Sequence, residues 1–185
     1  MKILIASDIH GDAECAKKLV EEFYRTGADK LLLLGDVLYH GPRNELPSGY
    51  APKAVISVLN GIKDKILCVR GNCDTEVDQM VLEFPILADY SFIAVDGLEI
   101  LATHGHNYNM NTVKNLSPNT ILLHGHTHVP VAEPFGNGNV YINPGSTSIP
   151  KENSPRSYIL YEDRCFSFRK LDDGSEYKRY EAKNV

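Results

Sequence analysis

The N-terminal third alternates between short apolar runs and a segment whose apolar positions recur at helical spacing. The apolar runs Lys2–Ala6, Lys30–Leu34 and Lys65–Val69 are typical of buried strands. Between the first two, Asp12 is a suitable N-cap and Gly27 a suitable C-terminal stop for a helix. The apolar face of this helix contains Ala16, Leu19, Val20 and Phe23.

A second helix is expected to begin near Pro52, because proline is favoured in the first helical turn, and to end before Gly61. Val55, Val58 and Leu59 would lie on one of its faces. The order strand, helix, strand, helix, strand implies right-handed crossovers and therefore a parallel sheet.

After Pro85 the pattern changes to hairpins. Asp96-Gly97 suits the tight turn that matches strand twist, so Ser91–Val95 and Leu98–Ala102 are expected to pair. Further strands are expected at Asn119–Leu123, Val140–Ile142, Ser157–Glu162 and Cys165–Leu171, the last two as a closing hairpin. Residues 172–185 form a polar C-terminal tail that we expect to be frayed or loosely docked. We find no linker or repeat, so residues 1–185 are expected to form a single α/β domain.

Composition excludes several classes of protein. The chain has 185 residues, 43% of them hydrophobic and 23% charged, which excludes a disordered or collagen-like chain. A formal net charge of −5 argues against a stable nucleic-acid complex. The apolar runs are too short to cross a bilayer, and no signal peptide is visible. Four cysteines without CxxC pairs or even spacing favour a reducing, cytoplasmic location.

Polar residues follow five of the predicted strands. These segments are Ser7–Gly11, Gly35-Asp36, Arg70–Asp74, His104–His106 and His124–His128. Six of the seven histidines lie in them, and side chains just beyond the carboxyl ends of neighbouring strands converge on one crevice. Each segment alone also fits a turn, a helix-capping loop or a partly buried histidine. Their joint arrangement favours a functional site.

The types of ligand indicate the chemistry. Asp oxygens, His nitrogens and an Asn carbonyl, without thiolates, suit borderline divalent metals. The seven candidate ligands are Asp8, His10, Asp36, Asn72, His104, His126 and His128. Seven groups are too many for one ion, whereas two ions sharing a bridging carboxylate would use them all. Such a pair suits hydrolysis of phosphate esters.

The motifs Asp-x-His, Gly-Asp, Gly-Asn-Cys-Asp, His and Gly-His-x-His, in this order, resemble those of the calcineurin-like metallophosphoesterase superfamily. More narrowly, Gly35–Asn44, Val69–Met80 and Ile142–Lys151 are similar to the YfcE-type phosphodiesterases. The similarity extends from about Met1 to Tyr158. It implies a four-layer αββα sandwich with two mixed β-sheets flanked by helices.

The resemblance also implies roles. One ion would be held by Asp8, His10, Asp36 and His128, and a second, bridged by Asp36, by Asn72, His104 and His126. A water or hydroxide between the ions would attack phosphorus in line. Asp74 would lie behind the ligands and orient its neighbours.

One position departs from much of the superfamily. Cys73 occupies the place where a histidine commonly contacts the phosphate or protonates the leaving group. This cysteine is expected from the resemblance to the YfcE-type branch and supports that narrower assignment, but it leaves the general acid unidentified. The thiol could donate a proton, or it could be a small filler beside the metals. His40, Arg43 and His106 are candidates for contact with substrate, although Arg43 could equally be a solvated surface charge.

We therefore expect a cytoplasmic phosphodiesterase with two divalent ions, Mn²⁺ by resemblance, with Zn²⁺, Fe²⁺, Co²⁺ or Ni²⁺ as alternatives. Its substrate would be a small phosphodiester or nucleotide-like molecule, and self-association into a homo-oligomer is possible. Two other functions stay open: a phosphomonoesterase of the same superfamily, and a non-catalytic scaffold of the same fold. A scaffold is expected to lose metal ligands, whereas every ligand position is filled here.

Overall fold

The computed structural model describes residues 1–183. Its first half contains three parallel strands, β1 (Ile3–Ala6), β2 (Lys30–Leu33) and β3 (Ile66–Cys68). Helices α1 (Ala13–Thr26) and α2 (Pro52–Asn60) connect them. This confirms the parallel βαβαβ order predicted from the apolar pattern.

The ends of α1 follow the expected capping chemistry. The Asp12 side chain accepts a hydrogen bond from the Cys15 backbone N–H, and Gly27 ends the helix in the left-handed conformation with φ of 65°. A short 3₁₀ helix, η1 (Lys63–Lys65), and a one-turn helix, α3 (Glu76–Gln79), were not predicted. Both are too short to produce a helical hydrophobic period.

The six-stranded sheet is completed by the C-terminal part of the chain. Strand β9 (Ser157–Glu162) pairs antiparallel with β1, and β10 (Cys165–Lys170) and β11 (Glu176–Glu181) follow it. The prediction of a frayed tail is therefore wrong for residues 176–181. Their backbone pairs with β10, and the ring of Tyr177 contacts that of Phe168 at a centroid distance of 6.3 Å.

The other sheet has five strands in the order β4-β5-β6-β8-β7. These are β4 (Tyr90–Val95), β5 (Leu98–Thr103), β6 (Ile121–Leu123), β7 (Pro130–Pro134) and β8 (Val140–Pro144). Strand β7 was not predicted because it begins and ends with proline, which sheets tolerate at an edge. Both sheets mix parallel and antiparallel pairs.

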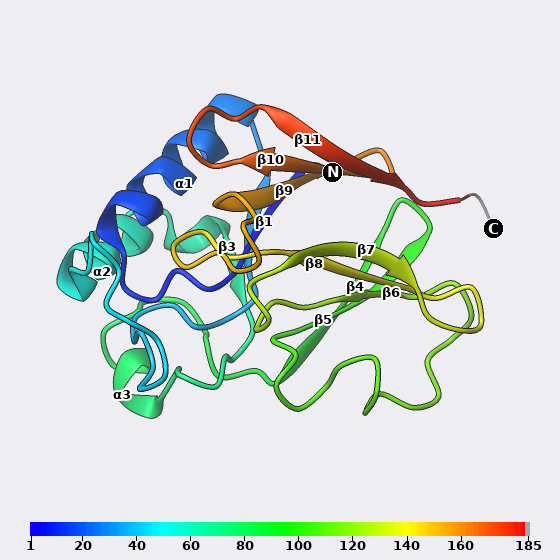
Figure 1. Cartoon of the computed structure of the whole chain (residues 1–185), viewed down its shortest axis with the longest axis horizontal. Helices are drawn as coiled ribbons and strands as arrows, with labels where there is room; N and C mark the ends of the chain where they lie inside the picture. Colours follow the sequence, from blue (N-terminus) through cyan, green and yellow to red (C-terminus); the bar gives the residue numbers. More distant parts are fainter. Residues whose placement is uncertain (184–185) are drawn as a thin grey trace.

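The layers are visible in Figure 1, where α1 and α2 cover the outer side of the six-stranded sheet. One apolar core, which we call the helix-side core, lies between these helices and the sheet and includes Leu4, Leu19 and Leu31. A second core lies between the two sheets and includes Ile3, Ile5 and Phe166. Alternate residues of β1 thus enter opposite cores, as a central strand requires.

The prediction of an α/β fold with two mixed sheets and helices is confirmed, and the three α-helices of residues 1–183 all precede residue 80. On the other outer face, residues of the irregular segment 108–116 line a hollow together with Phe92 and Leu101, and the Tyr108 ring contacts that of Tyr90. This segment is rich in asparagine, which favours turns over helix interiors. Among the residues described, no helix has the length and apolar character needed to cross a membrane.

Candidate metal centre

The structure brings all seven candidate ligands together at the carboxyl ends of the parallel strands. Asp8 lies within 3.6 Å of His10 Nε2 and 3.3 Å of His128 Nε2 through its Oδ1 atom. Asp36 Oδ2 lies 3.4 Å from His104 Nε2, which in turn is 3.1 Å from Asn72 Oδ1 and 3.2 Å from His126 Nδ1. We call these seven side chains the polar cluster.

The backbone of the polar cluster is unusual. Five of its members have positive φ: Asp8, His10, Asp36, His126 and His128, with values between 49° and 67°. This left-handed region is uncommon for residues other than glycine, and residues held there concentrate at functional sites. The loops also approach one another closely, since a Cβ atom at Gly71 would collide with the Asp36 side chain.

Backbone carbonyls fix the orientation of three imidazoles. The Nδ1 atoms of His10, His104 and His128 lie 2.8, 2.6 and 2.6 Å from the carbonyl oxygens of Tyr39, Leu34 and Ile149. A carbonyl oxygen only accepts, so each Nδ1 carries the proton. Each Nε2 therefore faces the carboxylates, which is the arrangement that metal-binding histidines usually show.

The centre of the cluster contains unpaired acceptors. Asp8 Oδ1 is completely buried and has no hydrogen-bond partner among the residues described. Beside it, the Nε2 atoms of His10 and His128 face each other at 3.3 Å. A buried carboxylate oxygen without a hydrogen-bond partner is costly unless a cation lies beside it. The donor set therefore fits divalent metal ions.

The electrostatics of the site point the same way. Burial alone would lower the pKa of His104, but the contact with Asp36 and the charges of Asp8 and Asp36 raise it to about 9. Burial would raise the pKa of Asp8, but His10 and His128 hold it well below its usual value. Burial, together with the charge of His104, lowers the pKa of His126 to about 4. The carboxylates thus create a strongly cation-attracting centre.

Three groups of residues present ligand atoms within 4.8 Å of one another. They are Asp8, His10 and His128; Asp8, Asp36 and His104; and His10, Asp36 and Cys73. The third group includes a sulfur, which the sequence analysis had not counted among the ligands. Burial and the neighbouring Asp36 raise the pKa of the Cys73 thiol to about 12.

The Asp74 carboxylate contacts the backbone of the loops. Its carboxylate accepts hydrogen bonds from the backbone N–H groups of Asp36, Val37 and Gly71 at 2.8, 2.9 and 2.7 Å. It thereby joins the loop after β2 to the loop after β3. Burial raises the pKa of Asp74 to about 6, although the three N–H groups oppose this shift.

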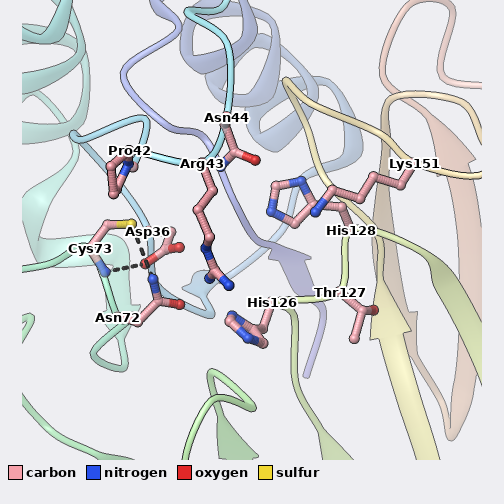
Figure 2. A pocket seen from close by; sticks show the side chains of 11 residues that line it. Asp36, Pro42, Arg43, Asn44, Asn72, Cys73, His126, Thr127, His128 and Lys151 are labelled. Atoms are coloured by element: carbon pink, nitrogen blue, oxygen red, sulfur yellow. Dashed lines mark hydrogen bonds between the residues drawn. The ribbon is translucent and has the colours of Figure 1, made fainter.

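A cavity of about 380 Å³ opens above Asp36, Asn72, His126 and His128. Figure 2 shows the Arg43 side chain reaching from the loop after β2 toward Asn72 and His126. Lys151 extends along His128 from the opposite side. Two cations facing each other over a cluster of potential metal ligands form an environment suited to an anion. We call this space the cationic cavity.

Residues 1–164 match the model of the calcineurin-like phosphoesterase superfamily domain. The chain belongs to this superfamily. It is 46% identical to phosphodiesterase YfcE of Escherichia coli K12 over 175 residues, which is 95% of each chain. A solved structure of YfcE, a phosphoesterase from E. coli, superposes with a TM-score of 0.95 at 44% identity, covering 99% of this chain and 100% of that one.

A more distant member of the fold is vacuolar protein sorting 29 from Cryptosporidium parvum. It is 17% identical, covers 97% of both chains and has a TM-score of 0.62. This likeness extends to the fold alone.

The other histidines of this superfamily member lie around the site without lining the cationic cavity. The ring of His40 packs between Tyr39 and Tyr50, and His106 lies beside His104 at a centroid distance of 5.4 Å. His124 is buried and stacks on Tyr141 at 4.1 Å. The contact of His40 and His106 with substrate stays a prediction. Arg43, the third candidate, lines the cationic cavity.

Sequence reasoning missed two residues of the site. Lys151 lines the cationic cavity, but nothing except its place after Ser-Ile-Pro distinguishes it from a surface lysine. Asn143 Nδ2 lies 2.9 Å from both the Gly125 carbonyl and Thr127 Oγ1, so it fixes the loop that carries His126 and His128. An asparagine preceding Pro-Gly is typical of a turn, so nothing in the sequence indicated this role.

Proposed function

We propose that this chain is a phosphodiesterase that uses two divalent metal ions, with Mn²⁺ as the proposed metal. The observation that carries the proposal is the buried, unpartnered Asp8 Oδ1 among imidazole nitrogens beneath a cavity with two cations. The choice of a diester over a monoester is supported by the 46% identity to phosphodiesterase YfcE.

The polar cluster divides into two sets of ligands. One ion would be held by Asp8, His10, Asp36 and His128, and the other by Asp36, Asn72, His104 and His126. When bound, the ions supply an activated water at neutral pH and offset the negative charge of the phosphate. Oxygen and imidazole donors without thiolate suit Mn²⁺, and Zn²⁺, Fe²⁺, Co²⁺ and Ni²⁺ are alternatives.

The remaining residues bind and position. Arg43 and Lys151 would each donate hydrogen bonds to a non-bridging phosphate oxygen and orient the diester for in-line attack. Asp74 acts as a positioning residue, because its three backbone contacts fix the loops that carry Asp36 and Asn72. These contacts link the two strand ends.

Cys73 is a candidate proton donor to the leaving oxygen, and the alternative is a small filler. Its Sγ atom lies 3.2 Å from Asn72 Nδ2, and its backbone N–H donates to Asp36 Oδ1 at 2.8 Å. Thiols form weak hydrogen bonds, so transfer from Cys73 would contribute less than transfer from an imidazole. Diesters with acidic alcohols should consequently be the better substrates.

The proposal is tested with bis(4-nitrophenyl) phosphate and 4-nitrophenyl phosphate, which share one chromogenic alcohol. The chain, stripped with a chelator and then reloaded with Mn²⁺, should hydrolyse the diester with the higher kcat/KM, and elemental analysis should find about two ions per chain. A preference for the monoester would make the enzyme a phosphomonoesterase. Full activity in the stripped chain would overturn the metal assignment.

A further inference from the structure

A second cavity shares the residue Cys73 with the cationic cavity. Its volume is about 360 Å³, and it lies between the loop after β2, the start of α2 and the one-turn helix α3. This volume is within the range of small-molecule sites, roughly 300–1,000 Å³. Figure 2 places Cys73 on the opposite side of the cationic cavity from Lys151.

The lining of this second space is largely apolar, and we call it the apolar cavity. Tyr39, Val77 and Val81 line it although 42%, 69% and 43% of their surfaces are exposed. Single exposed apolar residues are ordinary, but several around one cavity mark a binding surface. The apolar cavity therefore differs in chemistry from its cationic neighbour.

One wall of the apolar cavity is a fixed set of rings. Tyr39 and Tyr50 both contact the His40 ring edge to face, at centroid distances of 4.6 and 5.3 Å. The Tyr50 ring also packs against Gly11, where an added Cβ atom would come within 2.5 Å of it. Rings held in this way offer apolar surface at a low entropic cost.

The same wall is tied to the polar cluster. The Tyr39 carbonyl that orients His10 Nδ1 belongs to a residue whose side chain lines the apolar cavity. The carboxylate of Asp78, also in the lining, is engaged by the backbone N–H and hydroxyl of Thr75 at 2.8 and 2.9 Å. Apart from Lys53, the cavity is thus left with apolar groups as its main contacts.

We propose that the apolar cavity binds a flat, apolar ester group of the substrate, an aryl ring or a nucleobase, while the cationic cavity holds the phosphate. The inference rests on the proposed function, because the phosphate must lie over the polar cluster. Cys73 suits this arrangement, since a residue that lines both cavities with a small, weakly polar sulfur demands no hydrogen bond from the substrate.

The test measures binding to the Mn²⁺-loaded chain by calorimetry, without turnover. Phenylphosphonate and methylphosphonate carry the same headgroup and differ in the flat apolar group. Phenylphosphonate should bind about tenfold more tightly. Val77→Asp, which places a charge in the apolar cavity, should remove most of this ratio and change methylphosphonate binding by less than about twofold.

Met80→Asp is the matched control, because Met80 follows α3 directly, is 82% exposed and does not line the cavity. It adds the same charge and should preserve the tenfold ratio. A second pair, adenosine 5′-monophosphate and ribose 5-phosphate, differs only in the nucleobase. If Val77→Asp removes the affinity ratio of the phosphonate pair, the cavity binds an aryl group. If it removes the affinity ratio of the nucleotide pair, the cavity binds a nucleobase.

The proposal is overturned if wild type favours the larger ligand in neither pair, or if Val77→Asp leaves both ratios intact. It is also overturned if Val77→Asp weakens methylphosphonate as much as phenylphosphonate. These failures are separate from failure of the proposed function. The diesterase assay on wild type decides the proposed function. Normal diester turnover, together with affinity ratios that Val77→Asp leaves unchanged, would refute only the role proposed for the apolar cavity.

Discussion

The helix-side core and the polar cluster are two buried regions that meet at the carboxyl end of β1. They differ in backbone conformation and in the partners of their buried atoms. In the helix-side core, Leu4 and Leu31 pack against Leu19 of α1, with extended strands and a regular capped helix. In the polar cluster, Asp8 and His10 adopt positive φ, and the Asp8 carboxylate retains an unpartnered oxygen.

The difference indicates that neighbouring segments of the chain serve two different purposes, stability and ligand geometry. The helix-side core combines apolar burial with backbone conformations that its residues prefer, so it contributes stability. The polar cluster places charge and unfavourable backbone geometry in the interior, which costs stability in return for ligand geometry. Substitutions in the two regions should consequently affect different properties.

The largest expected effect belongs to the polar cluster. Asp36→Asn should lower kcat/KM for a diester by at least about 10³-fold, because one substitution removes a carboxylate proposed to serve both ions. Elemental analysis should show fewer ions at both positions. Asp172→Asn is the control, since this carboxylate is exposed and pairs only with Lys18. Near-normal turnover by Asp36→Asn would refute the shared ligand.

The opposite pattern is expected in the helix-side core. Leu19 is fully buried, so Leu19→Ala should lower the free energy of unfolding by about 3 kcal/mol through lost burial and a residual cavity. The folded fraction should keep its kcat. Tyr24 lies on the same helix and is 67% exposed. Tyr24→Ala should therefore lower the free energy of unfolding, measured in urea, by less than about 1 kcal/mol. A large loss of kcat in Leu19→Ala would mean that the two regions are not separable.

The polar cluster was predictable as a set but not as a geometry. Asp8, Asp36 and His104 each follow a short apolar run, and parallel strand ends converge, so their meeting could be predicted. The direction of each Nε2 could not be predicted, because it depends on carbonyl partners far away in the sequence. The partners of His10 and His104 are 29 and 70 residues away.

The fold shows the same limit. The capping residues Asp12 and Gly27 act locally, and the boundaries of α1 were predicted from them. Strand β11 depends on the free edge of β10 and on the contact between Tyr177 and Phe168, neither of which is visible in a polar segment. The apolar cavity was missed for this reason too, because Tyr39 and Val77 are distant in sequence.

Metal removal should sharpen the comparison. When the free metal concentration is about 100 times its dissociation constant, bound metal should stabilise the fold by about 2.7 kcal/mol. A chelator should remove this increment in stability. Leu19→Ala should retain the whole increment within about 0.5 kcal/mol, since effects at independent sites add. Urea unfolding of both proteins with Mn²⁺ and with chelator measures the two differences. An increment reduced to half in Leu19→Ala would show that the regions are coupled.

The smallest effect concerns a polar atom that borders the helix-side core and, unlike Asp8 Oδ1, has a partner. The Tyr158 hydroxyl donates to Glu22 of α1, whose carboxylate also pairs with Arg25. Tyr158→Phe should cost about 1 kcal/mol at pH 7 and leave kcat unchanged. Tyr24→Phe, at the exposed position of the same helix, should cost nothing measurable.

The pH dependence gives this last prediction its sign. The hydrogen bond from Arg25 lowers the pKa of Glu22 below its usual 4.5, and Tyr158 adds to the shift against the opposing effect of burial. A lowered pKa means that the ionised carboxylate contributes stability above pH 4.5, which is lost as pH falls through the folded-state value. The stability difference between wild type and Tyr158→Phe should therefore be constant from pH 7 to about 5 and shrink toward pH 3. A difference that grows on acidification would show that the hydroxyl stabilises the protonated carboxyl instead.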